Sequence, residues 1–270
     1  MALSEPPIWC RIILTIITAC SFLPQILRIL TTKSIRGISP LYVLWNLISA
    51  TEQFTIFFFG LINTWDPDGS IYLHAPPSKG DWFSLWHCGI TTVLFLVLFV
   101  QVLLYSDRGV FLGGSYISFL LVSVIPLIID AASPFDDPHE MFAGLFFGFH
   151  SMLFWPIITI LGCLSLYRQA QEIFAVPFPN SLSLQGLLLQ AIAFIVLSVA
   201  WIWCLPFPYE KAKGHWDEGA FSAWYFSIGW IVVDTFIFAF GQALLFVLAS
   251  RRASSDESMP REGETEPLLG

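Results

Sequence analysis

The segment from Pro24 to Asn46 reads PQILRILTTKSIRGISPLYVLWN. It begins inside an apolar run, which carries the pair Pro24-Gln25 close to its end. A short basic stretch with Lys33 and Arg36 follows, and a second apolar run comes directly after it. We therefore expect two apolar helices joined by a short basic turn.

The composition of the whole chain indicates a membrane protein. Its 270 residues are 56% hydrophobic and only 12% charged, and the mean hydropathy is +0.72. A soluble domain usually carries about 25% charged residues. A chain this apolar has more apolar surface than a globular core can bury. We therefore expect a lipid bilayer as its solvent. The net charge of −8 argues against a nucleic-acid partner.

The spacing of the cysteines and a search for known catalytic motifs give no indication of a metal site, a cofactor or an enzyme. All five cysteines lie in or beside apolar runs, and none forms a CxxC pair. We expect small buried apolar residues, against the alternative of a metal or disulfide framework. The sequence contains no P-loop, HExxH or nucleophile-elbow motif.

Seven apolar stretches are long enough to span a bilayer, which needs about 20 mostly apolar residues. Only helices suit a single chain of this pattern, because every backbone polar group must be satisfied internally. The sequence therefore predicts an all-α membrane protein with seven transmembrane helices. Pro156 should bend or interrupt the fifth helix, because proline removes a helical hydrogen bond. The stretches lie at about 6–31, 38–61, 81–105, 112–132, 141–173, 181–205 and 219–249.

The orientation of the helices follows from the Lys and Arg residues near their ends, which are in excess on the cytosolic side. We therefore expect a lumenal or extracellular N-terminus and a cytosolic C-terminus. The side assigned to the cytosol receives eight such residues: Arg28, Lys33, Arg36, Arg108, Arg168, Arg251, Arg252 and Arg261. The other side receives four: Arg11, Lys79, Lys211 and Lys213.

An internal repeat of a glutamine, a serine and a second amide divides the chain. The first copy is Gln25, Ser39 and Asn46, at offsets of 14 and 7, and the second is Gln171, Ser183 and Gln190, at offsets of 12 and 7. The repeats would be helices 1–3 and 5–7, in parallel orientation because helix 4 links them. The predicted domains are 1–105, the linker 106–140, 141–250 and a disordered polar tail 251–270.

The segment from Pro24-Gln25 to Ser39 resembles the PQ-loop motif of a family of seven-helix membrane proteins. The second copy is degenerate, with Ala170-Gln171 in place of Pro-Gln. The resemblance implies two parallel three-helix bundles joined by a linker helix (3+1+3). The family includes lysosomal exporters of cystine and of cationic amino acids, and SWEET transporters and KDEL receptors share its architecture. Its motif prolines serve as hinges, which implies a hinge at Pro24, against a static kink.

Asp234 is the residue that most favours a transport mechanism. It lies near the middle of the last apolar stretch, where a charged aspartate costs about 2.5–3.5 kcal/mol. Either a partner stabilises the charge or the group is neutral, and a carboxyl that can switch between the two suits proton coupling. The last helix of cystinosin-type exporters is similar, and a matching aspartate there takes part in proton coupling. The alternative is a structural aspartate held by a neighbouring hydroxyl or backbone group.

Other polar residues of the helices are candidates for the same pathway or for helix–helix contacts. Glu52 is a second acid, either a proton site or the partner of a basic residue, and Gln25 could bond backbone groups freed by Pro24. His150 is expected to be a satisfied packing residue, against the alternative of a functional histidine. The predicted substrate pathway comprises Asn46, Gln53, Gln171, Gln190 and Trp230. The alternative for its amides is interhelical bonding, worth about 0.6–2 kcal/mol per contact.

The C-terminal segment ends in a candidate sorting signal. Glu264 is followed four residues later by Leu268-Leu269, which resembles the acidic dileucine signal that clathrin adaptors bind. On a mobile cytosolic segment this signal would direct the protein to an endolysosomal or vacuolar membrane. The alternative is a chance match.

These observations predict a proton-coupled transporter of a small polar solute, with an amino acid as the favoured class, in a vacuolar or lysosomal membrane. The alternative is a membrane receptor or scaffold that uses the same fold without transport, such as a sorting receptor similar to the KDEL receptors. Asp234 in mid-membrane favours transport.

Overall fold

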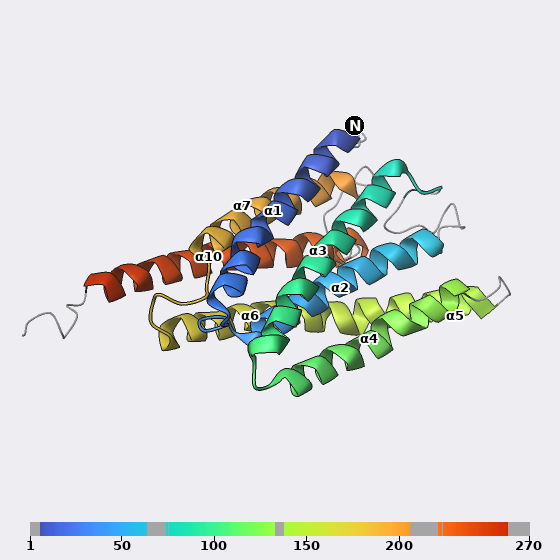
Figure 1. Cartoon of the computed structure of the whole chain (residues 1–270). Coiled ribbons are helices and arrows are strands. Elements are labelled where there is room, and N and C mark those ends of the chain that lie inside the picture. Colours follow the sequence, from blue (N-terminus) through green and yellow to red (C-terminus); the bar gives the residue numbers. More distant parts are fainter. Residues whose placement is uncertain are drawn as a thin grey trace, which may run out of the picture.

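The computed structural model describes residues 6–63, 74, 76–132, 138–205, 221–222 and 224–258, and this part of the chain is all helical, with no strand (Figure 1). The first four helices are α1 (Ile8–Thr32), α2 (Pro40–Ile62), α3 (Lys79–Tyr105) and α4 (Gly109–Ala132). The fifth helix consists of α5 (Pro138–Phe149), the π-helical turn η1 (His150–Phe154) and α6 (Trp155–Ala175). Helix α7 (Leu184–Cys204) follows, and the π-helical turn η2 (Tyr225–Gly229) leads into α10 (Trp230–Ser258).

Six of these helices, rather than the predicted seven, are long and apolar enough to span a membrane, counting within the described residues. Helix α2 is the exception, because polar residues such as Asn46, Glu52 and Gln53 lower its mean hydropathy. It has the length to span, and 14 of its 23 residues are buried among the other helices. Its polar groups are therefore surrounded by protein, which is where polar side chains at membrane depth are tolerated.

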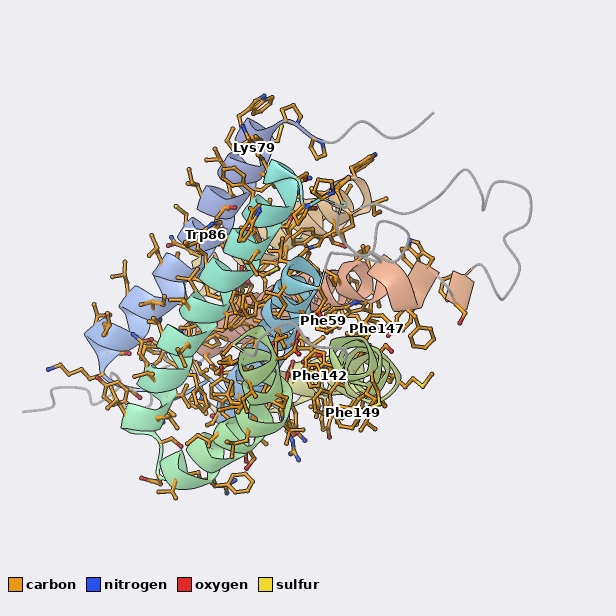
Figure 2. All side chains as sticks on the ribbon, turned by 90° about the vertical axis from the view of Figure 1, so that its right-hand side faces the viewer. Phe59, Lys79, Trp86, Phe142, Phe147 and Phe149 are labelled. Carbon is orange, nitrogen blue, oxygen red and sulfur yellow. The ribbon has the colours of Figure 1, made fainter. Side chains whose placement is uncertain are left out.

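Apolar side chains cover the outside of the bundle. Ile16, Trp86 and Ile117 are all more than half exposed, as expected for residues that face lipid tails. Figure 2 shows Trp86 pointing away from the bundle, with Lys79 at the start of the same helix. The outer surface therefore fits an integral multi-pass membrane protein.

The packing of the helices places α2 among several neighbours. Helix α3 packs against both α1 and α2, and α10 packs against both α6 and α7. Helix α1 also packs against α7, α2 packs against α6, and α4 packs against α2 and α3 (Figure 1). Helix α2 therefore has neighbours on several sides and lies where polar residues from different helices can meet.

The fifth helix is interrupted just before Pro156, as the sequence predicts. The Trp155 N–H bonds the His150 carbonyl oxygen, five residues back, in the π-helical pattern. Pro156 has no N–H and its ring hinders a regular preceding turn. A π-helical turn accommodates one extra residue, and such turns occur often at functional sites.

The last helix continues beyond the predicted end. Helix α10 runs to Ser258, whereas the sequence predicted a disordered tail from Arg251 onwards. Asp256 explains the extension, because it accepts a hydrogen bond from the Phe178 N–H (2.9 Å) and pairs with Arg252 one turn earlier (3.4 Å). The predicted sorting signal at Glu264, Leu268 and Leu269 lies outside the described residues.

Candidate functional site

Asp234 lies between α10 and α2, with its side chain buried. Its Oδ2 accepts hydrogen bonds from the Ser49 hydroxyl and from the Gln53 amide nitrogen, the latter at 3.1 Å. Ser49 and Gln53 are one helical turn apart on α2, so both reach the same oxygen. Both donors are neutral, so they stabilise the carboxylate without cancelling its charge. Proton coupling and a purely structural role both remain open for Asp234, because a hydroxyl and an amide hold its carboxyl group in place.

A small cavity opens beside this carboxyl group. Side chains from α2, α3, α7 and α10 line it, and its volume is about 20 Å³. A cavity of this size has room for roughly one water molecule. A larger solute would therefore need the helices to move. The polar lining is Asn46, Ser49, Gln53, Thr91, Asp234 and Thr235, and the apolar lining is Ala50, Phe95, Phe194 and Phe238.

The predicted pathway residues separate into several places. Asn46 and Gln53 line the cavity at Asp234, as expected for a shared pathway. Gln190 lines a second cavity nearer the turns, together with Gln25. Trp230 is buried and stacks on Trp155, with ring centroids 4.5 Å apart and an interplanar angle of 10°. Trp230 therefore has a packing role in this conformation.

Gln25 binds the turn that precedes α7. Its amide nitrogen donates to the Ser181 carbonyl oxygen (3.0 Å), and its amide oxygen accepts from the Ser183 N–H (2.8 Å). The expectation that Gln25 bonds backbone groups freed by Pro24 is therefore wrong, because both ends of its amide are used by the opposite repeat.

Gln169 makes the corresponding bonds in the other direction. Its side chain is fully buried, its oxygen accepts from the Ser39 N–H (2.9 Å), and its nitrogen donates to the Gly37 carbonyl oxygen (2.8 Å). Gln169 precedes Ser183 by 14 residues, the same offset that separates Gln25 from Ser39. In its contacts and in its offset, Gln169 therefore corresponds to Gln25.

The prediction of Gln171 for this position is wrong. Its side chain is exposed and bonds its own helix, at the Tyr167 hydroxyl (2.8 Å) and the Arg168 guanidinium (3.2 Å). Two residues along a helix correspond to about 200° of rotation, so Gln171 faces away from the turn that Gln169 reaches. The sequence signal that identifies Gln169 is the offset of 14 residues from the glutamine to the serine, which is the same as from Gln25 to Ser39. With this offset, Arg168 occupies the position that corresponds to Pro24.

The two turns also contact each other directly. The Ser181 N–H donates to the Arg36 carbonyl oxygen (2.9 Å), and the Arg28 guanidinium donates twice to the Asn180 carbonyl oxygen (2.9 and 2.7 Å). Gly37 has φ +87°, and a Cβ at this position would lie 2.7 Å from the Asn180 side chain. Glycine is therefore required there by both its conformation and its close contact.

Glu52 lies in a different place from Asp234, despite its proximity in sequence to Gln53. Its side chain is fully buried, with Oε1 2.5 Å from His150 Nδ1. Its Oε2 accepts a hydrogen bond from the Ser123 hydroxyl (2.9 Å). Of the two expectations for Glu52, the structure provides the basic partner. His150 is thus a buried histidine whose ring has a polar partner in this carboxyl group.

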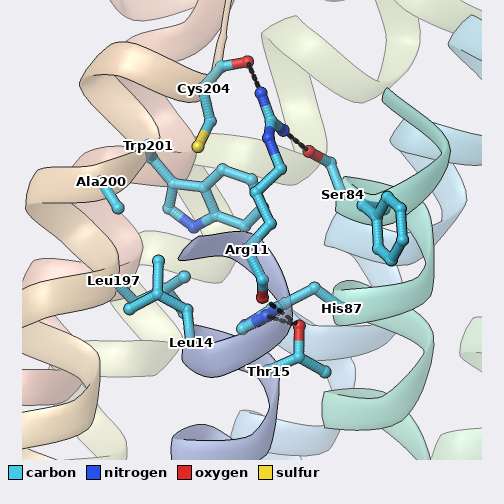
Figure 3. A pocket seen from close by; sticks show the side chains of 10 residues that line it. Arg11, Leu14, Thr15, Ser84, His87, Leu197, Ala200, Trp201 and Cys204 are labelled. Atoms are coloured by element: carbon cyan, nitrogen blue, oxygen red, sulfur yellow. Dashed lines mark hydrogen bonds between the residues drawn. The ribbon is translucent and has the colours of Figure 1, made fainter. Parts of the chain in front are cut away.

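A further polar group surrounds Arg11, which the sequence placed among the charges at the membrane surface. Its side chain is buried between α1, α3 and α7 (Figure 3). The guanidinium donates to the Ser84 hydroxyl (2.7 Å) and to the carbonyl oxygens of Gly80 (3.0 Å) and Cys204 (3.4 Å). His87 Nδ1 lies 3.0 Å from the Thr15 hydroxyl in the same group (Figure 3). These contacts join three helices at the end of the bundle opposite the two turns.

Residues 8–66 match the family model described as PQ loop repeat. This segment is a PQ-loop repeat. It contains α1, α2 and the turn between them, and therefore Pro24, Gln25 and Gly37. The match supports the PQ-loop family of membrane proteins for this chain. No curated protein matches the chain significantly. Among the described residues, no group of three or more His, Cys, Asp or Glu side chains could hold a metal ion.

Proposed function

We propose that this chain is a proton-coupled transporter of a small polar solute, with an amino acid as the favoured class. The observation that carries the proposal is the buried carboxyl group of Asp234, which faces a cavity with amide and hydroxyl groups from other helices. Members of the PQ-loop family are often transporters. The chain would act without an enzymatic step and without a cofactor.

The proposed architecture is two three-helix bundles with α4 as the linker. Helices α1–α3 would form the first bundle, and the fifth helix, α7 and α10 the second. Two features support this division: each third helix contacts both others of its group, and Gln25 and Gln169 make matching bonds to the opposite turns. The repeats would then be related by an approximate twofold axis, with the solute pathway between them.

The proposed coupling depends on the contact between Asp234 of one bundle and Ser49 and Gln53 of the other. The ionised carboxylate holds these donors. When a proton binds, the neutral carboxylic acid attracts these donors less strongly than the carboxylate did, and the bundles can separate on that side. A solute ammonium group would compete for the same carboxylate, while Asn46 and the hydroxyls lining the cavity would bind other polar groups of the solute. These chemical preferences support an amino acid.

Movement between the two access states would be a rocking of the bundles, with Pro24 as the hinge in α1. The bonds of Gln25 and Gln169 close the end of the bundle that carries the turns. If these turns face the cytosol, as the charge distribution predicts, this conformation would be closed toward the cytosol.

The proposed location is a vacuolar or lysosomal membrane, with the N-terminus in the lumen and the C-terminus in the cytosol. The candidate partners are the solute, protons, the lipid bilayer and a clathrin adaptor that binds Glu264, Leu268 and Leu269. The excess of Lys and Arg on one side and the spacing of the dileucine residues support this assignment.

The test is uptake of a panel of radiolabelled amino acids by proteoliposomes, with an acidic or a neutral lumen. We expect flux that depends on the proton gradient, and its loss of pH dependence in Asp234→Asn. Asparagine has nearly the same shape and can still accept from Ser49 and Gln53, so the fold should be retained. Asp130→Asn, a partly exposed acid of α4, is the matched control and should keep the pH dependence.

Two outcomes would contradict the proposal. Unchanged pH dependence in Asp234→Asn would remove Asp234 from the coupling. The absence of flux across a broad panel, with protein of normal thermal stability, would favour the alternative of a receptor or scaffold that does not transport.

A further inference from the structure

We propose that Glu52 and His150 form a second proton-binding centre, separate from Asp234, whose shared proton joins α2 to the π-helical turn of the fifth helix. The inference deepens the proposed function, on which it rests for the use of the proton in coupling. Its geometry and its test are independent of any transported solute.

The contact between the two side chains requires a hydrogen. Glu52 Oε1 lies 2.5 Å from His150 Nδ1, and both side chains are at most 1% exposed. A nitrogen and a carboxylate oxygen at this separation, without a proton between them, would direct two lone pairs at each other. Either the Nδ1–H of a neutral His150 donates to the carboxylate, which leaves the pair with a charge of −1, or the pair holds one further proton in addition to a ring N–H at Nε2.

The proton count explains why this site is stable at membrane depth. With the further proton the pair has no net charge, whether it is an imidazolium beside a carboxylate or a neutral ring beside a carboxylic acid, and burial favours this neutral pair. Loss of that proton leaves a buried carboxylate with neutral donors and no positive partner: the ring N–H of His150 and the Ser123 hydroxyl at 2.9 Å. An unpaired buried charge is expensive. Proton release would therefore weaken the contact between α2 and the π-helical turn.

The surroundings of His150 are aromatic. Its ring stacks on Phe146, with centroids 4.0 Å apart, and Phe154 lies edge-on at 4.9 Å. Figure 2 shows phenylalanines of this region, among them Phe59, whose ring stacks on Phe146 with centroids 4.9 Å apart. Such rings exclude water and attract a cationic imidazolium. In the described part of the chain, His150 Nε2 has no hydrogen-bond partner, so Glu52 provides the specific contact of this ring.

Three structural units meet at this centre. Glu52 belongs to α2, Ser123 to α4, and His150 is the first residue of the π-helical turn η1. In the proposed architecture these are the first bundle, the linker and the second bundle. A proton at this position therefore stabilises one arrangement of all three units.

Titratable groups on the neighbouring helices face other partners. Asp234 of α10 bonds Ser49 and Gln53 of α2, and Tyr116 of α4 lies 3.0 Å from the Thr51 hydroxyl. Asp130 is seven residues from Ser123 on α4, about two helical turns away. Tyr42 is buried on α2 itself, and His87 and Cys88 are buried on α3. The described side chains of α5 are all apolar.

The two proton sites are connected through adjacent residues of one helix. Glu52 contacts His150, while Gln53 donates to Asp234 at 3.1 Å. A rotation or shift of α2 on loss of the Glu52 proton would move the Gln53 donor relative to Asp234. The centre at Glu52 would in this way change the proton affinity of Asp234, without contacting the solute.

The experiment measures melting temperature against pH for the purified full-length protein in detergent, in an Asp234→Asn background. This background removes the titration of Asp234. If the pair shares this proton, the folded state binds more protons than the unfolded chain does. Stability should therefore fall with rising pH, because the folded state binds more protons. Adding Glu52→Gln or His150→Gln should remove this slope.

The matched control is His87→Gln in the same background. His87 is also buried, but its ring nitrogen faces the Thr15 hydroxyl instead of a carboxylate, so the slope should remain. If the hydrogen bond between Glu52 and His150 were merely structural, its removal would lower the melting temperature equally at every pH. The same slope in Glu52→Gln as in the control would overturn the proposal.

A second measurement covers the case in which the double variants do not fold. Infrared difference spectra of the Asp234→Asn protein, taken across the same pH range, should show carboxyl and imidazole bands changing together, as expected for one shared proton. Carboxyl bands that change without any imidazole change would overturn the proposal.

Discussion

Gln25 of α1 and Gln169 of α6 make the same two bonds to opposite turns. Gln25 Oε1 accepts from the Ser183 N–H at 2.8 Å, and Gln169 Oε1 accepts from the Ser39 N–H at 2.9 Å. Each amide nitrogen donates to a carbonyl oxygen two residues earlier in the same turn, at Ser181 and Gly37 respectively. The glutamine of the PQ-loop repeat thus fixes the turn of the other half of the protein.

We expect Gln169→Ala to destabilise the protein by about 1–3 kcal/mol, because it leaves the Ser39 N–H and the Gly37 carbonyl oxygen without their partner. Gln171→Ala is the control, since the exposed Gln171 bonds only its own helix, and should change stability by less than about 0.5 kcal/mol. Thermal or denaturant unfolding of the purified protein measures both. Equal effects of the two substitutions would contradict the assignment of Gln169.

Gly37→Ala should destabilise the protein by about 1 kcal/mol or more, since φ is +87° and the added Cβ would lie 2.7 Å from Asn180. Gly113→Ala is a matched control, because a Cβ there meets nothing within 4 Å. Alanine in a helix is favoured over glycine by roughly 0.8–1.0 kcal/mol, so this variant should be as stable as the wild type or more stable. Unfolding measurements in which Gly37→Ala is neutral would refute the requirement for glycine.

Trp230→Ala should cost about 3–5 kcal/mol of stability, as for other large aromatic side chains removed from a core. Trp86→Ala removes a side chain that is 66% exposed and should have a small effect. Because Trp230 stacks on Trp155, the milder Trp230→Phe should leave the solute concentration for half-maximal flux unchanged. A large change in that concentration, with normal stability, would indicate that Trp230 lines the solute pathway.

Replacement of Leu268 and Leu269 by alanine should move a fluorescently tagged protein from the internal membrane to the cell surface. The physical reason is that the two leucines would fill an apolar pocket of the adaptor, which alanine cannot fill. Live-cell imaging measures the distribution, with Leu244→Ala and Val247→Ala in α10 as a control outside the signal. An unchanged distribution would mean that the dileucine match is accidental.

The sequence predicted the helices well because a membrane imposes a simple requirement. Runs of about 20 apolar residues must become helices, so α1, α3, α4 and α7 lie within three residues of their predicted bounds. Helix α2 shows the limit of this reasoning, because its Asn46, Glu52 and Gln53 make it less apolar than a lipid-facing helix. The end of α10 was missed because Asp256 is stabilised by the Phe178 N–H, a contact distant in sequence.

The sequence predicted the residues of the candidate site better than it predicted their contacts. The central position of Asp234 in an apolar run is visible in the sequence. Its donors Ser49 and Gln53 lie on a helix about 180 residues earlier, and their choice depends on the rotation of α2 against α10. A shift of two residues in the second repeat, from Gln169 to Gln171, placed the glutamine on the wrong face of its helix.

The sequence by itself therefore determined a helical membrane protein, the first repeat from Pro24 to Asn46 and the buried acids Asp234 and Glu52, because length and apolarity act along the chain. Only the tertiary structure decided which groups meet: Asp234 with Ser49 and Gln53, Glu52 with His150 and Ser123, and each repeat glutamine with the opposite turn. The physical reason is that a hydrogen bond requires two atoms within about 3 Å, and helix packing sets that distance.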